Sequence, residues 1–285
     1  MGFFSSFKRW RVRIYKSIPW PIKWSARRPY YFVMDTIDLL LGRRDELAPP
    51  RRMGVGGGDF RKQGEEGLKY FVELCGLKPD ERVLDIGCGS GRMAFPLTGY
   101  LDKRGSYEGF DIVADEINWD RIKITAKYPN FHFQLADIYN KAYNPKGKYK
   151  ASEYKFPFGN GSFDFIFLTS VFTHMLPQDM ENYFSEIARV LKRDGRCLIT
   201  FFLLNTESIR LIETKSSLLD FQYRFKRYWT IDKNAHEAAV AYDEKFIRGL
   251  YEKYGLSIAE PISYGSWCKR KKFLNYQDIV IAIKK

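Results

Sequence analysis

Three glycines at alternate positions follow a short run of apolar residues near position 85. The run Val83–Ile86 predicts a buried β-strand, and Gly87, Gly89 and Gly91 follow it before a helical pattern begins. Glycines at such a strand-to-helix turn permit tight backbone conformations and let the backbone approach a ligand closely. In open parallel sheets the ligand lies beyond the carboxyl ends of the strands, so this segment predicts an α/β fold with a binding site at that edge.

The spacing of these glycines separates two classes of nucleotide-derived ligand. A dinucleotide loop has the pattern G-x-G-x-x-G and places a pyrophosphate at the helix N-terminus, whereas this chain has G-x-G-x-G. Asp85, two residues before the first glycine, would repel a pyrophosphate and would suit an ammonium group. Asp111, at the end of the next predicted strand, can accept hydrogen bonds from ribose hydroxyls, and Asp137, after the third strand, can meet an adenine edge. A phosphate-free adenosine that carries an amino acid, such as S-adenosylmethionine, fits these residues, and NAD does not.

From residue 82 onward the chain alternates between strand and helix patterns, which is typical of βαβ units and a parallel sheet. The expected strands are 82–86, 106–112, 131–136, 163–169, 196–204, 258–265 and 277–283. The expected helices are 30–41, 64–75, 93–101, 115–128 and 178–191.

Five motifs between Arg82 and Asn205 resemble, in order and spacing, those of the class I S-adenosylmethionine-dependent methyltransferases. They occupy residues 83–91, 109–112, 136–138, 156–166 and 186–196. The resemblance implies an α/β fold with a Rossmann-like, seven-stranded and mostly parallel sheet, whose last strand is antiparallel, and with helices on both faces. It also implies an S-adenosyl-L-methionine-dependent methyltransferase that releases S-adenosyl-L-homocysteine.

The resemblance assigns roles to residues of these motifs. Asp85 and the glycine-loop backbone are expected to hold the methionine part of the cofactor, and Asp111 the ribose. Asp137 and Ile138 are expected to frame the adenine, and Thr169 to face the sulfonium. The full set of expected cofactor-binding residues is Asp85, Gly87, Cys88, Gly89, Gly91, Arg92, Asp111, Ile112, Asp137, Ile138 and Thr169.

A catalytic base is needed only if the methyl acceptor is a hydroxyl or a protonated amine. His174 follows the fourth expected strand, where the acceptor is expected to enter, and is the candidate base. The alternative is that His174 caps or packs the following helix. The Asn/Asp-Pro-Pro-Tyr/Phe motif of amino-nucleobase methylases is absent, because Thr169-Ser170-Val171-Phe172 stands in its place.

Two connecting segments, 139–158 and 205–242, are longer than connections in compact domains usually are. We expect these two segments to act as substrate lids, as long insertions at this edge of a sheet often do. The alternative is that they are solvated surface loops. Their many aromatic residues favour a small organic acceptor and O-methylation of a sugar, a lipid-linked precursor or a phenolic metabolite. Two other functions stay open: a tRNA or protein methyltransferase whose basic footprint includes Lys269–Lys272, and a non-catalytic cofactor-binding module.

The N-terminal extension carries much of the net charge of +13. Residues 1–30 contain eight Lys and Arg and no acidic residue, with Phe3, Phe7, Trp10 and Ile14 at helical spacing before Pro19. We expect this basic helical arm either to pack on the remaining domain or to lie on an anionic membrane surface. Binding of the arm to nucleic acid is the least favoured alternative. We therefore expect an extension over 1–60 and a methyltransferase domain over 61–285.

Two absences in the sequence limit the class of protein further. No apolar stretch reaches the length of a membrane-spanning helix. The four cysteines are far apart and lack metal-ligand spacing, so neither a disulfide scaffold nor a metal site is expected. The expected location is a reducing cytoplasm, with peripheral membrane contact through residues 1–30 as an option.

Overall fold

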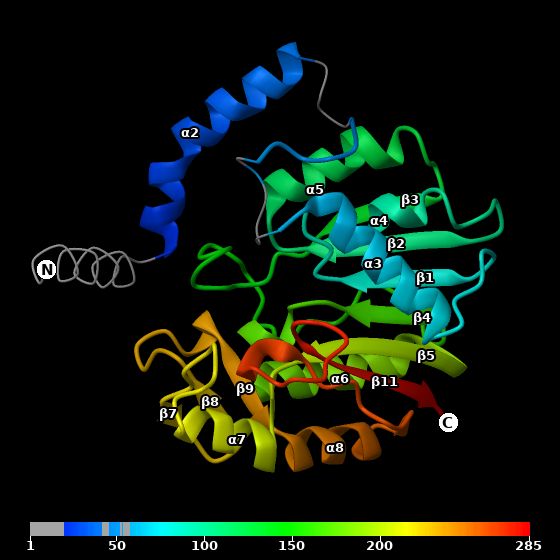
Figure 1. Ribbon diagram of the computed structural model, residues 1–285. Coiled ribbons are helices and arrows are strands. Elements are labelled where there is room, and N and C mark those ends of the chain that lie inside the picture. Colours follow the sequence, from blue (N-terminus) through cyan, green and yellow to red (C-terminus); the bar gives the residue numbers. More distant parts are fainter. Residues whose placement is uncertain (1–19, 42–45, 52, 54–57) are drawn as a thin grey trace, which may run out of the picture. The chain divides into compact units, whose positions relative to one another are not determined.

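The computed structural model describes residues 20–41, 46–51, 53 and 58–285 (Figure 1). Contacts divide the chain into two units, residues 1–57 and 58–285, which we describe separately. The predicted aromatic stripe from Phe3 to Ile14 lies outside the described residues.

The first unit contains α2, Trp20–Leu40. This helix begins ten residues before the expected start, with Pro21 in its first turn and Pro29 inside it. A proline is tolerated in the first turn because its missing N–H has no intrahelical partner there. After the helix, the backbone N–H of Arg51 donates to Asp35 at 3.0 Å and its guanidinium pairs with Asp38.

The second unit is built on a seven-stranded sheet with the order β10-β11-β5-β4-β1-β2-β3. Its strands are β1 Arg82–Ile86, β2 Ser106–Asp111, β3 Phe131–Leu135, β4 Phe163–Leu168, β5 Leu191–Phe201, β10 Leu256–Ile258 and β11 Asp278–Lys284. The first five strands pair in parallel, and β11 is antiparallel to both β5 and β10. The expected fold class is therefore confirmed.

Helices surround this sheet (Figure 1). They are α3 Phe60–Glu73, α4 Ala94–Leu97, α5 Ala114–Asp120 with its π-helical continuation η1 Arg121–Thr125, η2 Phe172–His174, α6 Pro177–Val190 and α8 Glu244–Lys253. Central β4 is buried along almost its whole length, as expected for a strand covered on both faces. The ring of Phe71 on α3 packs 4.4 Å from that of Phe167, centroid to centroid.

The strand order reverses between β1 and β4, because the chain runs from β1 outward to β3 and then returns to the other side of β1. The carboxyl ends of β1 and β4 thus form the topological switch point of the sheet, where ligands bind in open α/β folds. The glycine loop that follows β1 and the segment that follows β4 both lie at this point.

In the second unit, three expected elements differ most from their expected bounds. The helix expected at 93–101 is only the short α4, which contains Pro96. The strand expected at 196–204 begins earlier, at Leu191, and Asp194 within it has a φ of 60°. The strand expected at 258–265 is β10, Leu256–Ile258, and beyond it a single bridge at Ser263 pairs with β11. Pro261 lacks the N–H that a longer ladder would need.

The segment 205–242 is not an irregular loop. With its flanks it forms a second sheet of the order β6-β9-β8-β7, made of Leu203–Leu204, Val240–Asp243, Tyr228–Thr230 and Tyr223–Arg224. Helix α7, Thr206–Glu213, and the 3-10 turns η3, His236–Ala238, and η4, Ser266–Cys268, accompany it. Phe202, Phe221 and Trp267 are buried in its own hydrophobic core. Strands of two to four residues are too short to give a periodic pattern, so the sequence did not predict this sheet.

The four cysteines, Cys75, Cys88, Cys197 and Cys268, are free and buried. Among the described helices, none is both long and apolar enough to cross a lipid bilayer.

Candidate functional site

The glycine loop between β1 and α4 uses backbone conformations that only glycine adopts easily. Gly87, Gly89 and Gly91 have φ values of 81°, 53° and 74°. The N–H groups of Gly87 and Cys88 both donate to the carbonyl of Phe110 in β2, at 2.9 and 3.1 Å. A Cβ on Gly87 would lie 2.4 Å from Val171 Cγ2, so the segment after β4 packs directly against the loop.

Asp85 lies in β1 beneath this loop and is 1% exposed. Its Oδ2 accepts a hydrogen bond of 2.7 Å from the hydroxyl of Tyr107, while its buried Oδ1 has no hydrogen-bond partner. Burial raises the pKa of Asp85 to about 8. A buried carboxylate oxygen without a partner can accept a hydrogen bond from a bound ligand, and a cationic donor would restore the ionised form.

Asp111 holds the glycine loop from the end of β2. Its Oδ2 accepts from the N–H of Gly89 at 2.9 Å, and its Oδ1 accepts from the N–H of Val113 at 3.0 Å. Burial raises the pKa of Asp111, and these backbone hydrogen bonds oppose the shift. The two aspartates predicted from the sequence therefore flank the same loop, and Ile112 beside them packs against the core.

Two further acidic residues, which the sequence analysis missed, lie near the loop. Glu116 is 3% exposed, and its Oε2 lies 3.3 Å from the position of a Cβ on Gly89. Asp120 is fully buried, and burial raises its pKa to about 10. Both residues come from α5, in the helical region that the sequence predicted. Their approach to the loop depends on how α5 packs against it, which no local pattern reveals.

Cys88 and Arg92, the other predicted loop residues, are not exposed. Burial raises the pKa of the Cys88 thiol well above its usual value, and the carboxyl groups of Asp111, Asp85, Asp120 and Glu116 add to the shift. The side chain of Arg92 contacts the side-chain oxygen of Gln63 in α3.

Asp137 and Ile138 follow β3 at the same edge of the sheet. Ile138 is buried, whereas the Asp137 side chain is 39% exposed and lies 3.5 Å from Lys148 Nζ. The Asp137 carbonyl also accepts from the N–H groups of Lys148 and Tyr149, each at 3.0 Å. The predicted insertion 139–158 is thus tied to one of the expected cofactor residues.

Thr169 directly follows β4 at the switch point, and its neighbour Ser170 has an unusual backbone. Ser170 has a φ of 62°, which is costly for a residue other than glycine and is found most often at functional sites. Its N–H donates to Thr200 Oγ1 at 2.8 Å, and its hydroxyl donates to Gln277 Oε1 at 3.1 Å. Thr169 was predicted from the sequence and Ser170 was not, since backbone strain has no signature in residue types.

His174, the predicted base, joins the segment after β4 to the second sheet. Its Nδ1 lies 2.9 Å from the carbonyl oxygen of Glu237 in η3. A carbonyl only accepts, so Nδ1 carries a proton in this contact. Burial lowers the pKa of His174, which favours the neutral ring. The contact gives His174 a packing role and leaves its role as a base a hypothesis.

The residues at this edge fit a cofactor with a positive charge and no phosphate. The orphaned Oδ1 of Asp85 lies in an acidic surrounding that suits an ammonium or sulfonium group and disfavours a phosphate. The Cβ positions at Gly87 and Gly91 are blocked by neighbouring side chains, which explains why the loop has no side chains there. Within the described residues, no cluster of His, Cys, Asp and Glu has the geometry of a metal site.

Comparison with known proteins agrees with this geometry. A protein-family model described as a methyltransferase domain matches residues 60–260, which is more than half of the chain. The O-methyltransferase cnsE of Penicillium expansum is 30% identical over 42% of this chain and 37% of its own length. Phosphoethanolamine N-methyltransferase 3 of Arabidopsis thaliana is 27% identical over 51% of this chain and 26% of its own length. The chain thus spans little more than a third, or less, of these curated relatives.

Among solved structures, the magnesium protoporphyrin IX methyltransferase of Synechocystis PCC 6803, with bound S-adenosylhomocysteine, has a TM-score of 0.51. It is 18% identical, and the match covers 89% of this chain and 99% of that one. At this identity the similarity concerns the fold alone. The family-model match confirms the family that the sequence predicted, and with it the cofactor, S-adenosylmethionine; the solved structure agrees in fold. This chain belongs to the class I S-adenosylmethionine-dependent methyltransferases.

Proposed function

We propose that this protein transfers the methyl group of S-adenosylmethionine to a hydroxyl group of a small organic acceptor. The observation that carries the cofactor half of the proposal is the buried, unpartnered Oδ1 of Asp85 under the glycine loop. The cofactor supplies a methyl group on a positively charged sulfur. Asp85 would hold its ammonium group, Asp111 its ribose and Ile138 its adenine. Because the sulfonium is already a good leaving group, the residues of this site would promote the reaction chiefly by aligning the acceptor with the methyl group and the sulfur.

The acceptor half of the proposal depends on the segment after β4. Ser170, held by Gln277 and Thr200, would position the acceptor, and the neutral His174 would take the hydroxyl proton on Nε2. The two curated relatives named above are an O- and an N-methyltransferase. Our proposal that the acceptor atom is oxygen is therefore based on the contacts of Ser170 and His174 and not on similarity.

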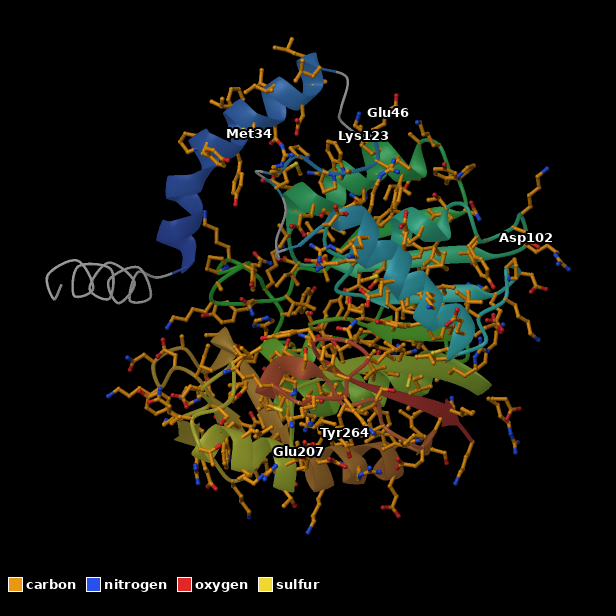
Figure 2. The ribbon with its side chains drawn as sticks, in the orientation of Figure 1. Met34, Glu46, Asp102, Lys123, Glu207 and Tyr264 are labelled. Atoms are coloured by element: carbon orange, nitrogen blue, oxygen red, sulfur yellow. The ribbon has the colours of Figure 1, made fainter. Side chains whose placement is uncertain are left out.

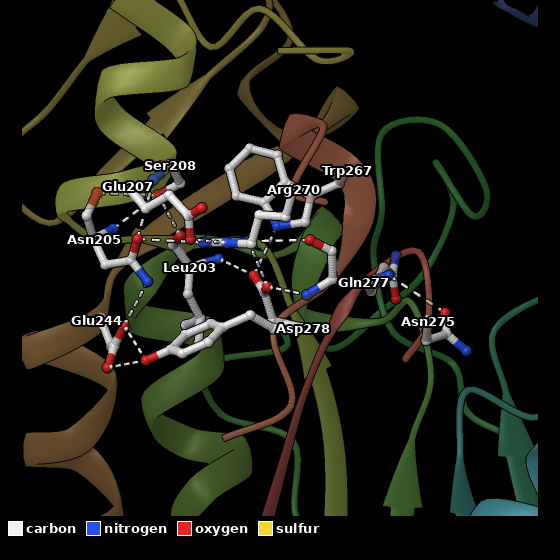
Figure 3. Close-up of polar contacts among 12 residues, drawn as sticks. Leu203, Asn205, Glu207, Ser208, Glu244, Trp267, Arg270, Asn275, Gln277 and Asp278 are labelled. Carbon is white, nitrogen blue, oxygen red and sulfur yellow. Dashed lines mark hydrogen bonds and ion pairs between the residues drawn. The ribbon is translucent and has the colours of Figure 1, made fainter. Parts of the chain in front are cut away.

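The structure weakens one argument for a nucleic-acid substrate. Of the basic run Lys269–Lys272, Arg270 is only 5% exposed, and its Nη1 lies 3.1 Å from Asp278 Oδ1 (Figure 3). Its Nε also lies 3.0 Å from Glu207 (Figure 3). A guanidinium neutralised in this way is not available to a phosphate backbone.

Transfer of labelled methyl from S-adenosylmethionine into fractionated cell extract tests the proposal. A labelled methyl ether of a small molecule is expected, and a labelled methyl ester, protein, tRNA or amine would contradict it. Asp111→Ala is expected to weaken binding of S-adenosylhomocysteine by about 10- to 150-fold, the loss of one charge-assisted hydrogen bond of about 1.5–3 kcal/mol. Calorimetry that shows unchanged binding would remove Asp111 from the site.

A further inference from the structure

One exposed loop combines positive charge with large apolar side chains. We call residues Lys269–Gln277 the basic loop; it contains three exposed lysines, Lys269, Lys271 and Lys272, and no acidic residue. Directly after them, Phe273, Leu274 and Tyr276 are 58%, 41% and 44% exposed. Large apolar side chains gathered in one exposed segment mark a contact surface more often than scattered ones do.

The exposure of these side chains does not result from a loosely held loop. At one end, buried Asp278 accepts hydrogen bonds from the N–H of Gly265 and from Trp267 Nε1, both at 2.7 Å (Figure 3). Across the loop, the N–H groups of Ser266 and Trp267 donate to the carbonyls of Asn275 and Tyr276, both at 3.0 Å. Anchors on both sides therefore hold the apolar side chains toward solvent.

The basic loop lies beside the candidate site. Its last residue, Gln277, accepts the hydrogen bond from Ser170 after β4. On its other side, the hydroxyl of Tyr70 in α3 lies 3.1 Å from the carbonyl oxygen of Leu274. Asp278 pairs with Phe201 at the end of β5, so the loop projects from the carboxyl edge of the sheet. A surface that contacts the basic loop would therefore also approach the expected acceptor entrance.

We propose that the basic loop docks on an anionic lipid bilayer and brings the site to an acceptor held in that bilayer. Phe273, Leu274 and Tyr276 would enter the boundary between headgroups and acyl chains, while the neighbouring lysines contact anionic headgroups. An aliphatic side chain such as Leu274 gains from a lipid interior and gains little from a nucleic acid, whose bases stack on aromatic rings. The net charge of +13 adds long-range attraction to the same surface.

Helix α2, in the other unit of the chain, also combines exposed apolar side chains with basic residues that are close in the sequence. Tyr30, Val33, Ile37 and Leu40 recur at helical spacing and are 63%, 54%, 41% and 79% exposed. They follow the eight basic residues of 1–30 in the sequence. Each unit thus presents exposed apolar side chains together with basic residues that are close in the sequence, a combination that suits an anionic bilayer.

A fluorescent label on the full-length chain tests whether the loop enters lipid. The four native cysteines are buried, so an environment-sensitive fluorophore can be attached selectively at Phe273→Cys. The matched control is Ile122→Cys; Ile122 is 69% exposed and directly precedes Lys123, which is labelled in Figure 2. With phosphatidylcholine vesicles containing about 30% phosphatidylglycerol, we expect a blue shift at position 273 and none at 122. No shift at 273, or equal shifts at both positions, would overturn the proposal, as would a shift caused by tRNA and not by vesicles.

Substitutions then separate the apolar from the charged contribution. Phe273→Ala with Leu274→Ala, and separately Lys271→Ala with Lys272→Ala, are each expected to weaken co-sedimentation with anionic vesicles at least about tenfold. Lys103→Ala with Ile122→Ala removes the same kinds of exposed group outside the basic loop and is expected to leave binding unchanged. Unchanged binding by both loop variants would show that the loop does not dock on lipid.

The docking proposal rests on the proposed function only where it identifies the bilayer-held molecule as the methyl acceptor. The docking surface and the proposed function can therefore fail separately. Calorimetry with S-adenosylhomocysteine is run on the same variants. If wild type binds the cofactor product but vesicles do not shift the label at Phe273→Cys, the docking surface is wrong and the methyltransferase assignment stands. If the label shifts but the cofactor product does not bind, the proposed function fails and the docking surface stands.

Discussion

The two sides of the candidate site are organised by different kinds of contact. On the cofactor side, residues 82–138, the glycine loop is held by groups about twenty residues away, such as Phe110 and Asp111. On the proposed acceptor side, residues 203–243 and 265–278, which adjoin the segment after β4, Asp278 accepts from the N–H of Leu203, 75 positions earlier. Arg270 likewise reaches Glu207 at the start of α7. The cofactor side is therefore held largely by contacts between neighbouring strands and the loops that follow them, and the acceptor side by buried polar contacts between segments much farther apart in the sequence.

The largest effect is expected where the acceptor side depends on one buried carboxylate. Asp278→Ala leaves the buried Arg270 without that partner and removes the acceptor of two N–H groups and one indole. Removing one partner of a buried ion pair costs about 3–5 kcal/mol. Urea unfolding of Asp278→Ala measures this loss. The matched control is Asp220→Ala, whose exposed pair with Lys215 is worth at most about 1 kcal/mol; equal losses would contradict this view of the acceptor side.

The next effect concerns the shape of the glycine loop. Gly87→Ala adds a Cβ 2.4 Å from Val171 Cγ2 in a backbone with a φ of 81°. We expect binding of S-adenosylhomocysteine to weaken by about 10- to 100-fold, equivalent to about 1.4–2.8 kcal/mol, because the added Cβ displaces the segment after β4. Gly255→Ala is the control for the same kind of backbone strain outside the loop, because Gly255 has a φ of 68° and open space around its Cβ position, and it is expected to bind like the wild type. If both variants bind equally well, the loop does not shape the cofactor site.

The pH dependence of cofactor binding tests the role given to Asp85. With its pKa raised to about 8, this carboxyl is mostly protonated at pH 6 in the free protein. If the ionised form binds the ammonium group, affinity for S-adenosylhomocysteine rises up to about tenfold per pH unit between 6 and 8. The ligand-free chain should lose stability from about pH 4 to pH 8, because the folded state keeps a proton that the unfolded state releases.

Calorimetry across this pH range measures the slope. In Asp85→Asn the slope is expected to disappear. A slope that persists in Asp85→Asn would assign the titration to another group.

The smallest effect on stability is expected at the junction between the two sides. His174→Asn keeps an N–H that can donate to the Glu237 carbonyl, so the free energy of unfolding should change by about 1 kcal/mol or less. His174→Ala loses that donor and should be less stable than His174→Asn. If His174 is the base, neither variant forms the labelled methylated product. If it only packs the junction, His174→Asn stays active, and the base hypothesis is wrong.

Much of the cofactor side could be predicted from the sequence. Strand β1 has the expected bounds, and Asp85 and Asp111 flank the glycine loop as their positions predicted. Each of these features depends on the end of a strand or on a glycine. The backbone preferences of such residues act within a few positions of the sequence, where a local pattern can reveal them. The contribution of α5 was missed, because the approach of Glu116 and Asp120 depends on how that helix packs.

The acceptor side was not predictable in the same way. The basic run Lys269–Lys272 suggested a phosphate-binding footprint, yet Arg270 is buried against Asp278. The segment 205–242 was expected to be a lid or a solvated loop; it contributes three strands of a second sheet, which contradicts the loop, and its role as a lid stays a prediction. The charge, the glycine spacing and the alternation of strands and helices were thus determined by the sequence itself. The burial of Arg270, the left-handed Ser170 and the contact between His174 and Glu237 were decided by tertiary structure, because burial and long-range pairing exist only once the chain has folded.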